Sequence, residues 1–342
     1  MYTENTIIRD LRVLQEHFIP SRIIHRDGQL QAIRDDLQPL LEKGRARNIF
    51  LHGNPGTGKT SMARYVVEEL RKHVTVHHSY VNCWKYPSKF RILFSILEDF
   101  GETLSIHRKG IPTDELLDIL RKKAKGTYGV IILDESDKIE EESVIYDLLE
   151  TEKICLIFIA NSATAFYNLD PRIRSRLSTM DDIEFQPYST SELADILKDR
   201  AEWALVPGVV LNGQLEAIAA AAGGDARAAI DILRIAAEEA EKKDMEKLSD
   251  AAIEKALPKF RAQQETDKLQ VLNDHQKLLL EIIKKQGKTN PDNLYVEFSK
   301  RTKDSGLREI NERTIRKNLE RLAFYKLIAA EGEGRWRTYS AA

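Results

Sequence analysis

Eight residues early in the chain have the types and spacing of a phosphate-binding loop, or P-loop. Residues 53–60 read Gly-Asn-Pro-Gly-Thr-Gly-Lys-Thr. Glycines let a backbone curl until successive N–H groups point inward, where with the dipole of the following helix they hold a polyphosphate. The lysine of this pattern reaches the β- and γ-phosphates, and the last hydroxyl binds Mg²⁺. The sequence therefore predicts a nucleotide site that uses Lys59 and Thr60.

Acidic and amide side chains follow two later apolar runs. Residues 128–133 are followed by Asp-Glu-Ser-Asp, beginning at Asp134, and residues 154–160 are followed by Asn161. Carboxyl ends of parallel strands meet at one edge of a sheet, where ligands gather, so these side chains are expected beside the phosphates. We expect Asp134 to hold Mg²⁺ through water, Glu135 to deprotonate the attacking water and Asn161 to bond the γ-phosphate. The alternative for these residues is a helix or loop cap.

Arginines stand out in two further places. Three lie within residues 172–176, and Arg227 lies in the first turn of an expected helix, where it opposes the helix dipole. We expect Arg227 to contact a phosphate, and a surface ion pair is the alternative. Arg172 and Arg176 could reach the γ-phosphate of a neighbouring subunit, bind DNA or remain solvated.

These groups require a parallel sheet with helices between its strands. Apolar runs predict a strand before the P-loop and four more at 74–82, 128–133, 154–160 and 183–185. Helices are expected at 7–17, 29–43 and 61–72. The helical stretch 87–125 exceeds the dozen or so residues of a simple crossover, which indicates an insertion. Ile23, Ile24 and His25 are candidates for packing on the nucleotide base, and a plain core role is the alternative.

The remainder of the chain is predicted to be mostly helical. Helices are expected at 189–203, 211–222, 226–243 and 249–255. Polar residues 258–266 then indicate a linker. The last block predicts three helices and a hairpin, an order typical of a winged helix-turn-helix whose third helix enters the DNA major groove. A protein-binding winged helix is the alternative.

Basic residues of that last block are the candidate DNA contacts. Its third helix carries Ile315, Leu319 and Leu322 on one stripe and polar side chains on the other. The residues expected to contact DNA are Arg313, Thr314, Arg316, Lys317, Arg335 and Arg337. Residues 268–342 contain 16 Lys and Arg against 10 Asp and Glu, a net charge of +6. The whole chain carries −2, so residues 1–267 carry −8, and the basic end indicates a polyanionic partner.

Length and composition limit the class of protein. A chain of 342 residues is long enough for about two or three domains. It has no run of about 18 apolar residues, and charges interrupt residues 1–20 where a secretory signal needs an apolar core. We therefore expect a cytoplasmic protein with no membrane partner. Cys83 and Cys155 lie in or beside apolar runs and are expected to be buried thiols.

Taken together, these motifs resemble those of the AAA+ ATPases. Within that class the chain is similar to the archaeal origin-recognition initiators, relatives of the eukaryotic origin recognition complex and its licensing partner. The specific cues are the terminal winged helix, Ile19-Pro20 with Ile24-His25-Arg26, Tyr80-Val81-Asn82-Cys83, Phe185-Gln186-Pro187-Tyr188-Ser189 and Gly224-Asp225-Ala226-Arg227. Ser136 departs from the family, where an apolar residue is usual, and is expected to affect packing more than chemistry.

The resemblance implies an α/β fold with three domains. These are an AAA+ base at 1–186 with a five-stranded parallel sheet and a helical insert at about 87–112, a helical lid at 187–258 and, after a linker at 259–269, a winged helix at 270–342. ATP or ADP with Mg²⁺ is the implied cofactor. Its implied binding residues are Asn54, Pro55, Gly56, Thr57, Gly58, Lys59, Thr60, Ser61, Ile24, Tyr188, Arg200 and Arg227. The implied catalytic residues are Glu135, Lys59 and Asn161, and the implied metal ligands are Thr60 and Asp134. Arg172 and Arg176 match the family's arginine fingers. The insert implies a second contact with DNA.

The expected function is ATP-controlled initiation of DNA replication. Such a protein binds double-stranded origin DNA, helps to recruit or load the replicative helicase, acts beside paralogous initiators at the nucleoid and hydrolyses ATP slowly as a switch. The alternative is an ATP-switched DNA-binding regulator or signalling NTPase that loads no helicase. A processive motor or clamp loader would need pore loops or partner subunits, and we find no pore-loop signature.

Overall fold

The computed structural model describes residues 7–15, 18–20, 22–102, 110–270, 272–324, 327–332 and 337–341. The chain divides into two compact units, residues 1–257 and residues 258–342. Within the described ranges, no helix combines the length and the hydropathy needed to cross a membrane.

A five-stranded parallel sheet forms the centre of the larger unit. Its strands lie in the order β2-β3-β4-β1-β5, and every neighbouring pair is parallel. Their bounds are β1 Ile49–His52, β2 His77–Asn82, β3 Gly129–Asp134, β4 Ile154–Ala160 and β5 Asp181–Glu184. β3 and β4 are buried along their whole length, as continuous apolar strands inside a parallel sheet must be. The predicted sheet is confirmed.

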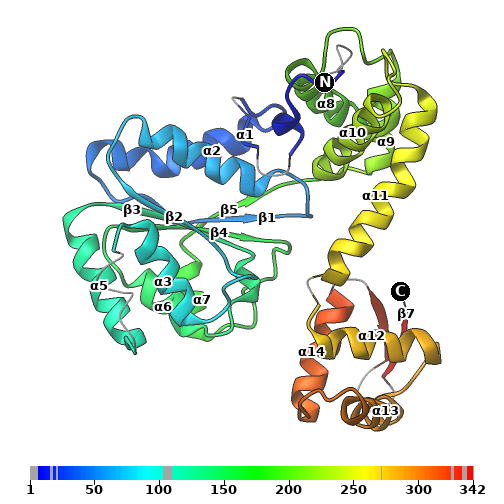
Figure 1. Ribbon diagram of the computed structural model, residues 1–342. Coiled ribbons are helices and arrows are strands. Elements are labelled where there is room, and N and C mark those ends of the chain that lie inside the picture. Colours follow the sequence, from blue (N-terminus) through cyan, green and yellow to red (C-terminus); the bar gives the residue numbers. More distant parts are fainter. Residues whose placement is uncertain are drawn as a thin grey trace. The chain divides into compact units, whose positions relative to one another are not determined.

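Helices cover both faces of this sheet (Figure 1). On one face lie α1 Asp27–Leu37, continued by the short helix η2 Gln38–Glu42, and α2 Lys59–Arg71. On the other lie α3 Lys89–Asp99, α5 Thr113–Gly126, α6 Ser143–Leu149 and α7 Pro171–Leu177. Phe50 and Leu51 of β1 enter opposite cores, because successive strand residues point to opposite faces. Cys83 and Cys155 are buried free thiols, as predicted. The expected insertion includes 103–109, which fall outside the described residues.

The lid consists of α8 Thr190–Ala204, α9 Gln214–Ala222, α10 Ala226–Glu241 and the start of α11 Asp250–Gln270. A capping box of Ser189 and Glu192 begins α8, and the Asp225 side chain accepts a hydrogen bond from the Ala228 N–H at the start of α10. α11 continues through the segment predicted as a linker at 259–269, so that segment is helical. Eight of the residues 259–269 are Lys, Arg, Gln, Glu, Ala or Leu, which favour helix over coil.

The helix predicted at 7–17 is not formed. Within the described residues of that range, only Leu11–Leu14 form a short 3₁₀ helix, η1. The Arg9 and Asp10 N–H groups donate to the Ala204 carbonyl at 2.7 and 3.0 Å, and Ile8 forms an antiparallel bridge with Leu205. Backbone bonds to the lid thus replace the expected internal ones, because distant partners outweigh weak local helix propensity.

The smaller unit has three helices and an antiparallel hairpin. They are α12 Asp274–Gln286, α13 Pro291–Asp304, α14 Glu312–Phe324, β6 Ile328–Glu331 and β7 Thr338–Ala341. Thr289 adds a third strand position, since it exchanges backbone hydrogen bonds of 2.9 and 2.8 Å with Tyr339. Ile315, Leu319 and Leu322 of α14 are buried, which confirms the predicted apolar stripe. This order of elements fits the predicted winged helix; residues 333–336 of the hairpin lie outside the described residues.

Ser136, the residue that departs from the family pattern, provides a test of packing. It is buried, and its hydroxyl donates to the Ile159 carbonyl of β4 at 2.9 Å. Ser136→Ala should lower the free energy of unfolding by about 1–3 kcal/mol, because a buried acceptor loses its donor. Urea denaturation measures this change.

The matched control is Ser178→Ala. The Ser178 hydroxyl donates to the Ser175 carbonyl at 2.8 Å from an exposed position, so its loss should change the free energy by less than about 0.5 kcal/mol. Equal losses in the two variants would contradict a specific role for the Ser136 bond.

Candidate nucleotide-binding site

The P-loop turns from β1 into α2 at the carboxyl edge of the sheet. Gly53, Gly56 and Gly58 have φ angles of 138°, 73° and 94°, which residues with a side chain rarely adopt. A Cβ atom at Gly53 would lie 2.2 Å from the Phe185 carbonyl oxygen. One at Gly56 would lie 1.9 Å from a carboxylate oxygen of Asp225. The loop is therefore packed against both the segment after β5 and the start of α10.

Lys59 is the buried cation of the site, with 6% of its surface exposed. Its Nζ donates to the carbonyls of Gly53 at 2.7 Å and Asn54 at 2.8 Å, and to Asn161 Oδ1 at 3.4 Å. Burial lowers the pKa of Lys59 to about 8, although the charge of Asp134 opposes that shift. Asn54 contributes its carbonyl, and it is not among the described residues that line the cleft. The ammonium can exchange these neutral oxygens for phosphate oxygens.

Asp134 ends β3 and is buried beside Thr60. Thr60 Oγ1 donates to Asp134 Oδ2 at 2.9 Å, and Asp134 Oδ1 accepts from the Glu135 N–H at 3.0 Å. A hydroxyl and a carboxylate are oxygen donors of the kind that Mg²⁺ takes. The described residues contain no group of three or more His, Cys, Asp or Glu arranged for a metal. Mg²⁺ takes few protein ligands and completes its shell with water and phosphates.

Glu135 and Asn161 meet across the ends of β3 and β4. Asn161 Nδ2 donates to Glu135 Oε2 at 3.2 Å, while its Oδ1 accepts from Lys59. One amide therefore connects the cation with the carboxylate. Burial, followed by the charge of Asp134, raises the pKa of Glu135. A raised pKa makes this carboxylate a stronger proton acceptor when it is ionised.

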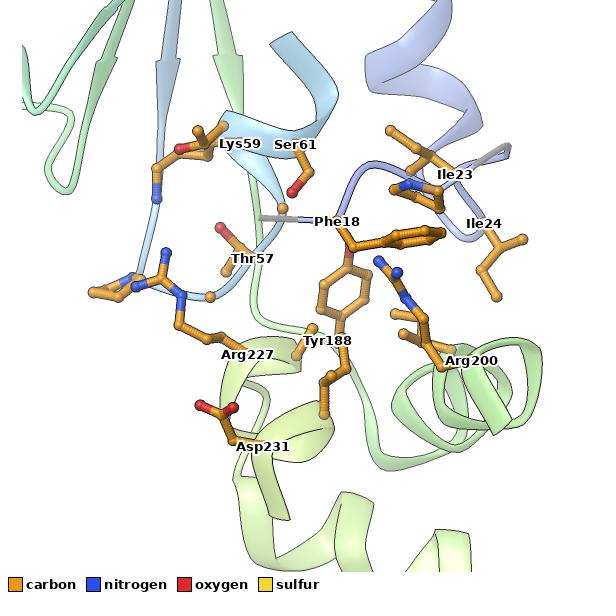
Figure 2. A pocket seen from close by; sticks show the side chains of 18 of the residues that line it. Phe18, Ile23, Ile24, Thr57, Lys59, Ser61, Tyr188, Arg200, Arg227 and Asp231 are labelled. Atoms are coloured by element: carbon orange, nitrogen blue, oxygen red, sulfur yellow. The ribbon is translucent and has the colours of Figure 1, made fainter. Parts of the chain in front are cut away.

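The lid forms the opposite wall of the cleft. Tyr188, Arg200 and Arg227 line it from the lid side, and Ile24 lines it from the segment before α1 (Figure 2). Arg227 extends from the start of α10 towards the P-loop, where its charge contributes to the lowered pKa of Lys59. The structure thus brings the implied nucleotide-binding, catalytic and metal residues, apart from Asn54, to one cleft.

Phe18 also lies in this cleft, beside Tyr188 (Figure 2), and was not predicted. The Cζ atom of Arg200 lies 4.8 Å from the Phe18 ring centre, and its Nη1 donates to the Val13 carbonyl at 3.1 Å. Arg200 therefore holds the N-terminal segment against the cleft. The only signal for Phe18 in the sequence is its place in the same apolar stretch as Ile24.

His25, one of the three candidates for packing on the base, contacts the lid instead of lining the cleft. Its Nε2 lies 2.9 Å from Asp195 Oδ2 on α8, and His25 is absent from the described residues that line the cleft. The next residue, Arg26, is buried, with its Cζ atom 3.8 Å from the Tyr188 ring centre and a hydrogen bond to the Gln186 carbonyl. The partners of Arg26 are an aromatic ring and a carbonyl rather than an acidic side chain. The pattern of charged residues in the sequence therefore could not predict where Arg26 lies.

Arg172 and Arg176 lie on α7, away from the cleft of their own chain; neither belongs to its described lining. Arg176 forms an ion pair with Glu150, and its Cζ atom lies 4.9 Å from the Tyr146 ring centre. A contact of these arginines with a γ-phosphate therefore requires a neighbouring subunit.

The candidate DNA contacts of the smaller unit gather on α14. Its exposed residues include Arg313, Thr314, Arg316 and Lys317. Arg316 Nε donates to the Tyr295 hydroxyl at 3.3 Å. In the hairpin, the Cζ atom of Arg337 lies 5.9 Å from the Tyr339 ring centre, whereas Arg335 lies outside the described residues.

Comparisons with known proteins agree with this geometry. A model of the Cdc6 AAA+ ATPase-type lid domain matches residues 194–257, and a model of the AAA domain matches residues 42–164. The chain is 38% identical to ORC1-type DNA replication protein 9 of Halobacterium salinarum, over 99% of this chain and 95% of that protein. It is 39% identical to ORC1-type DNA replication protein 1 of the same organism, over 87% of this chain and 97% of that one.

A solved structure agrees over nearly the whole chain. The Aeropyrum pernix ORC1 protein, solved in complex with DNA, gives a TM-score of 0.85 at 27% identity, over 99% of this chain and 94% of that chain. The P-loop, the acidic strand end and the lid arginine are therefore set in a shared architecture. The chain belongs to the family of archaeal ORC1-type/Cdc6 replication proteins, which are AAA+ ATPases.

Proposed function

We propose that this protein binds ATP with Mg²⁺ between its base and lid, hydrolyses it slowly and uses the bound nucleotide to control its grip on double-stranded origin DNA. One observation carries the proposal. Four side chains meet beside the P-loop and face the lid arginine. They are Lys59 at the start of α2, Asp134 and Glu135 at the end of β3, and Asn161 at the end of β4.

Each of these residues has a distinct task. Bound MgATP supplies the reactive γ-phosphate. Lys59 and the P-loop N–H groups bind phosphate oxygens, and Thr60 and Asp134 hold the metal. Glu135 accepts the proton of the attacking water, and the 3.2 Å bond from Asn161 fixes the orientation of its carboxylate.

Slow turnover is supported by the place of the candidate arginine fingers. An arginine that reaches the γ-phosphate accelerates phosphoryl transfer by about 10³–10⁵-fold. Arg176 is instead paired with Glu150 of its own chain, and Arg172 does not line the cleft. A single chain therefore works without this acceleration, which suits a nucleotide that serves as a switch.

Control by nucleotide is supported by the contact between the P-loop and the lid. The Ala226 N–H of α10 donates to the Gly56 carbonyl at 3.0 Å, and Asp225 lies directly against Gly56. A nucleotide in the P-loop meets both sides of this contact. Gain or loss of the γ-phosphate then changes which lid position is favoured.

DNA as the partner is supported by the four exposed candidates on α14, the net charge of +6 over residues 268–342 and the DNA complex of the Aeropyrum pernix relative. The proposal includes recruitment of the replicative helicase, action beside paralogous initiators and a place in the cytoplasm at the nucleoid, and family membership supports these roles. A DNA-binding regulator that loads no helicase would share this site, and a helicase-loading assay on origin DNA separates the two.

Two substitutions separate binding from turnover. Lys59→Ala should abolish ATP binding, because the phosphates lose their buried cation. Glu135→Ala should retain ATP binding while hydrolysis stops, because the water loses its proton acceptor. Filter binding and phosphate release measure the two steps, and Glu152→Gln, at an exposed carboxylate, is the control that should change neither. Normal hydrolysis by Glu135→Ala would contradict the assignment of the base.

Affinity for ATP should fall as the pH rises through about 8. Burial lowers the pKa of Lys59 to about 8, so the ammonium is charged below that pH and neutral above it. The charged fraction falls by about tenfold per pH unit beyond the pKa, and affinity should follow it. Lys59→Arg keeps its charge in this range and should give a flat profile. A fluorescent ATP analogue measures both profiles, and an equally flat wild-type profile would refute the expectation.

Arg313→Ala should weaken binding to origin DNA by about 1–3 kcal/mol and reduce the salt dependence of that binding. Arg301→Ala is the matched control, because the Arg301 guanidinium is paired with Glu297 at 2.8 Å on α13. Footprints on repeated origin sequences and salt titrations measure the effects. Equal affinity of the wild-type protein for origin DNA and for unrelated DNA would exclude origin recognition.

A further inference from the structure

Tyr80 of β2 contacts the carboxylate that would hold the metal. Its hydroxyl donates to Asp134 Oδ2 at 2.8 Å, the same oxygen that accepts from Thr60 at 2.9 Å. In the sheet register Asn82 pairs with Asp134, so Tyr80, two residues earlier on β2, points to the same face as Asp134. Tyr80 is not among the described residues that line the cleft, so any effect it has on a ligand passes through Asp134.

The phenol is itself held in place. The Cζ atom of Arg64 on α2 lies 5.3 Å from the centre of the Tyr80 ring. The ring thus lies beneath a guanidinium of α2, while its hydroxyl reaches β3.

These contacts fix the rotation of the Asp134 carboxylate. Oδ2 accepts two hydroxyl protons and Oδ1 accepts the Glu135 N–H, so three donors hold its two oxygens. Because the Thr60 proton points at Oδ2, the lone pairs of the Thr60 oxygen remain for a cation in the cleft. Loss of the Tyr80 donor would leave a buried carboxylate with one hydrogen bond fewer and greater freedom to turn away from Thr60.

We propose that Tyr80 is a positioning residue for Mg²⁺. Tyr80 orients Asp134, so that Asp134 and Thr60 present their oxygens to the metal. This inference rests on the proposed Mg²⁺–nucleotide site, to which β1, β3 and β4 already contribute. Tyr80 makes β2 a part of that site as well.

The test is Tyr80→Phe, which removes one oxygen and keeps the ring over which Arg64 lies. Binding of a fluorescent ATP analogue is titrated with MgCl₂ and repeated in EDTA. The Mg²⁺ concentration for half-maximal enhancement of binding should rise about tenfold or more, the usual effect of removing a partner that orients a metal ligand. Affinity in EDTA should stay within about twofold of the wild type, because the effect on the nucleotide passes through the metal.

Tyr128→Phe is the matched control. Tyr128 directly precedes β3, and its hydroxyl donates to the Lys43 carbonyl far along the strand from Asp134. This variant should show the wild-type Mg²⁺ midpoint. A Tyr80→Phe midpoint equal to that of the wild type would overturn the inference, and so would an equal loss of affinity in EDTA, which would mark a structural role. If the wild-type protein bound the ATP analogue equally well in MgCl₂ and in EDTA, the proposed metal site itself would be refuted.

Discussion

At Gly53 and Gly56 the P-loop backbone lies so close to Phe185 and Asp225 that no side chain fits between them. Phe185 belongs to the segment that leads into the lid, and Asp225 caps the lid helix α10. The phosphate-binding loop therefore packs against both the segment that leads into the lid and the lid helix itself. The proposed nucleotide switch depends on these two close-packed contacts.

Burial shapes the chemistry of the same region. An ammonium out of water costs several kcal/mol unless partners compensate, and Lys59 has two carbonyls and an amide oxygen in hydrogen-bonding range. That burial also moves the pKa of Lys59 down and the pKa of Glu135 up, towards each other. Asn161 is neutral and hydrogen-bonds both groups, so it links the Lys59 ammonium with the Glu135 carboxylate.

Features that depend on local sequence could be predicted. The P-loop, the continuous apolar runs of β3 and β4 and the acidic end of β3 are each contained in a few consecutive residues. Features that depend on contacts with distant backbone could not be predicted. The segment at 7–15 has a helical pattern but bonds to Ala204, and Arg26 finds a carbonyl and a ring more than a hundred residues away.

The same division applies within the site. The residue types that bind phosphate and metal are recognisable from their spacing, whereas the groups that orient them come from neighbouring strands. Tyr80 on β2 contacts Asp134 on the neighbouring strand β3, and Phe18, in the segment that precedes α1, contacts Arg200 of the lid. Only the sheet register and the return of the N-terminal segment bring these pairs together.

The bridge between Ile8 and Leu205 has a mechanical consequence. Residues 7–15 bond to the lid while α1 packs on the sheet, so the chain passes between lid and base twice, the second time through residues 185–189. Any movement of the lid against the base would have to be accommodated in both connections at once.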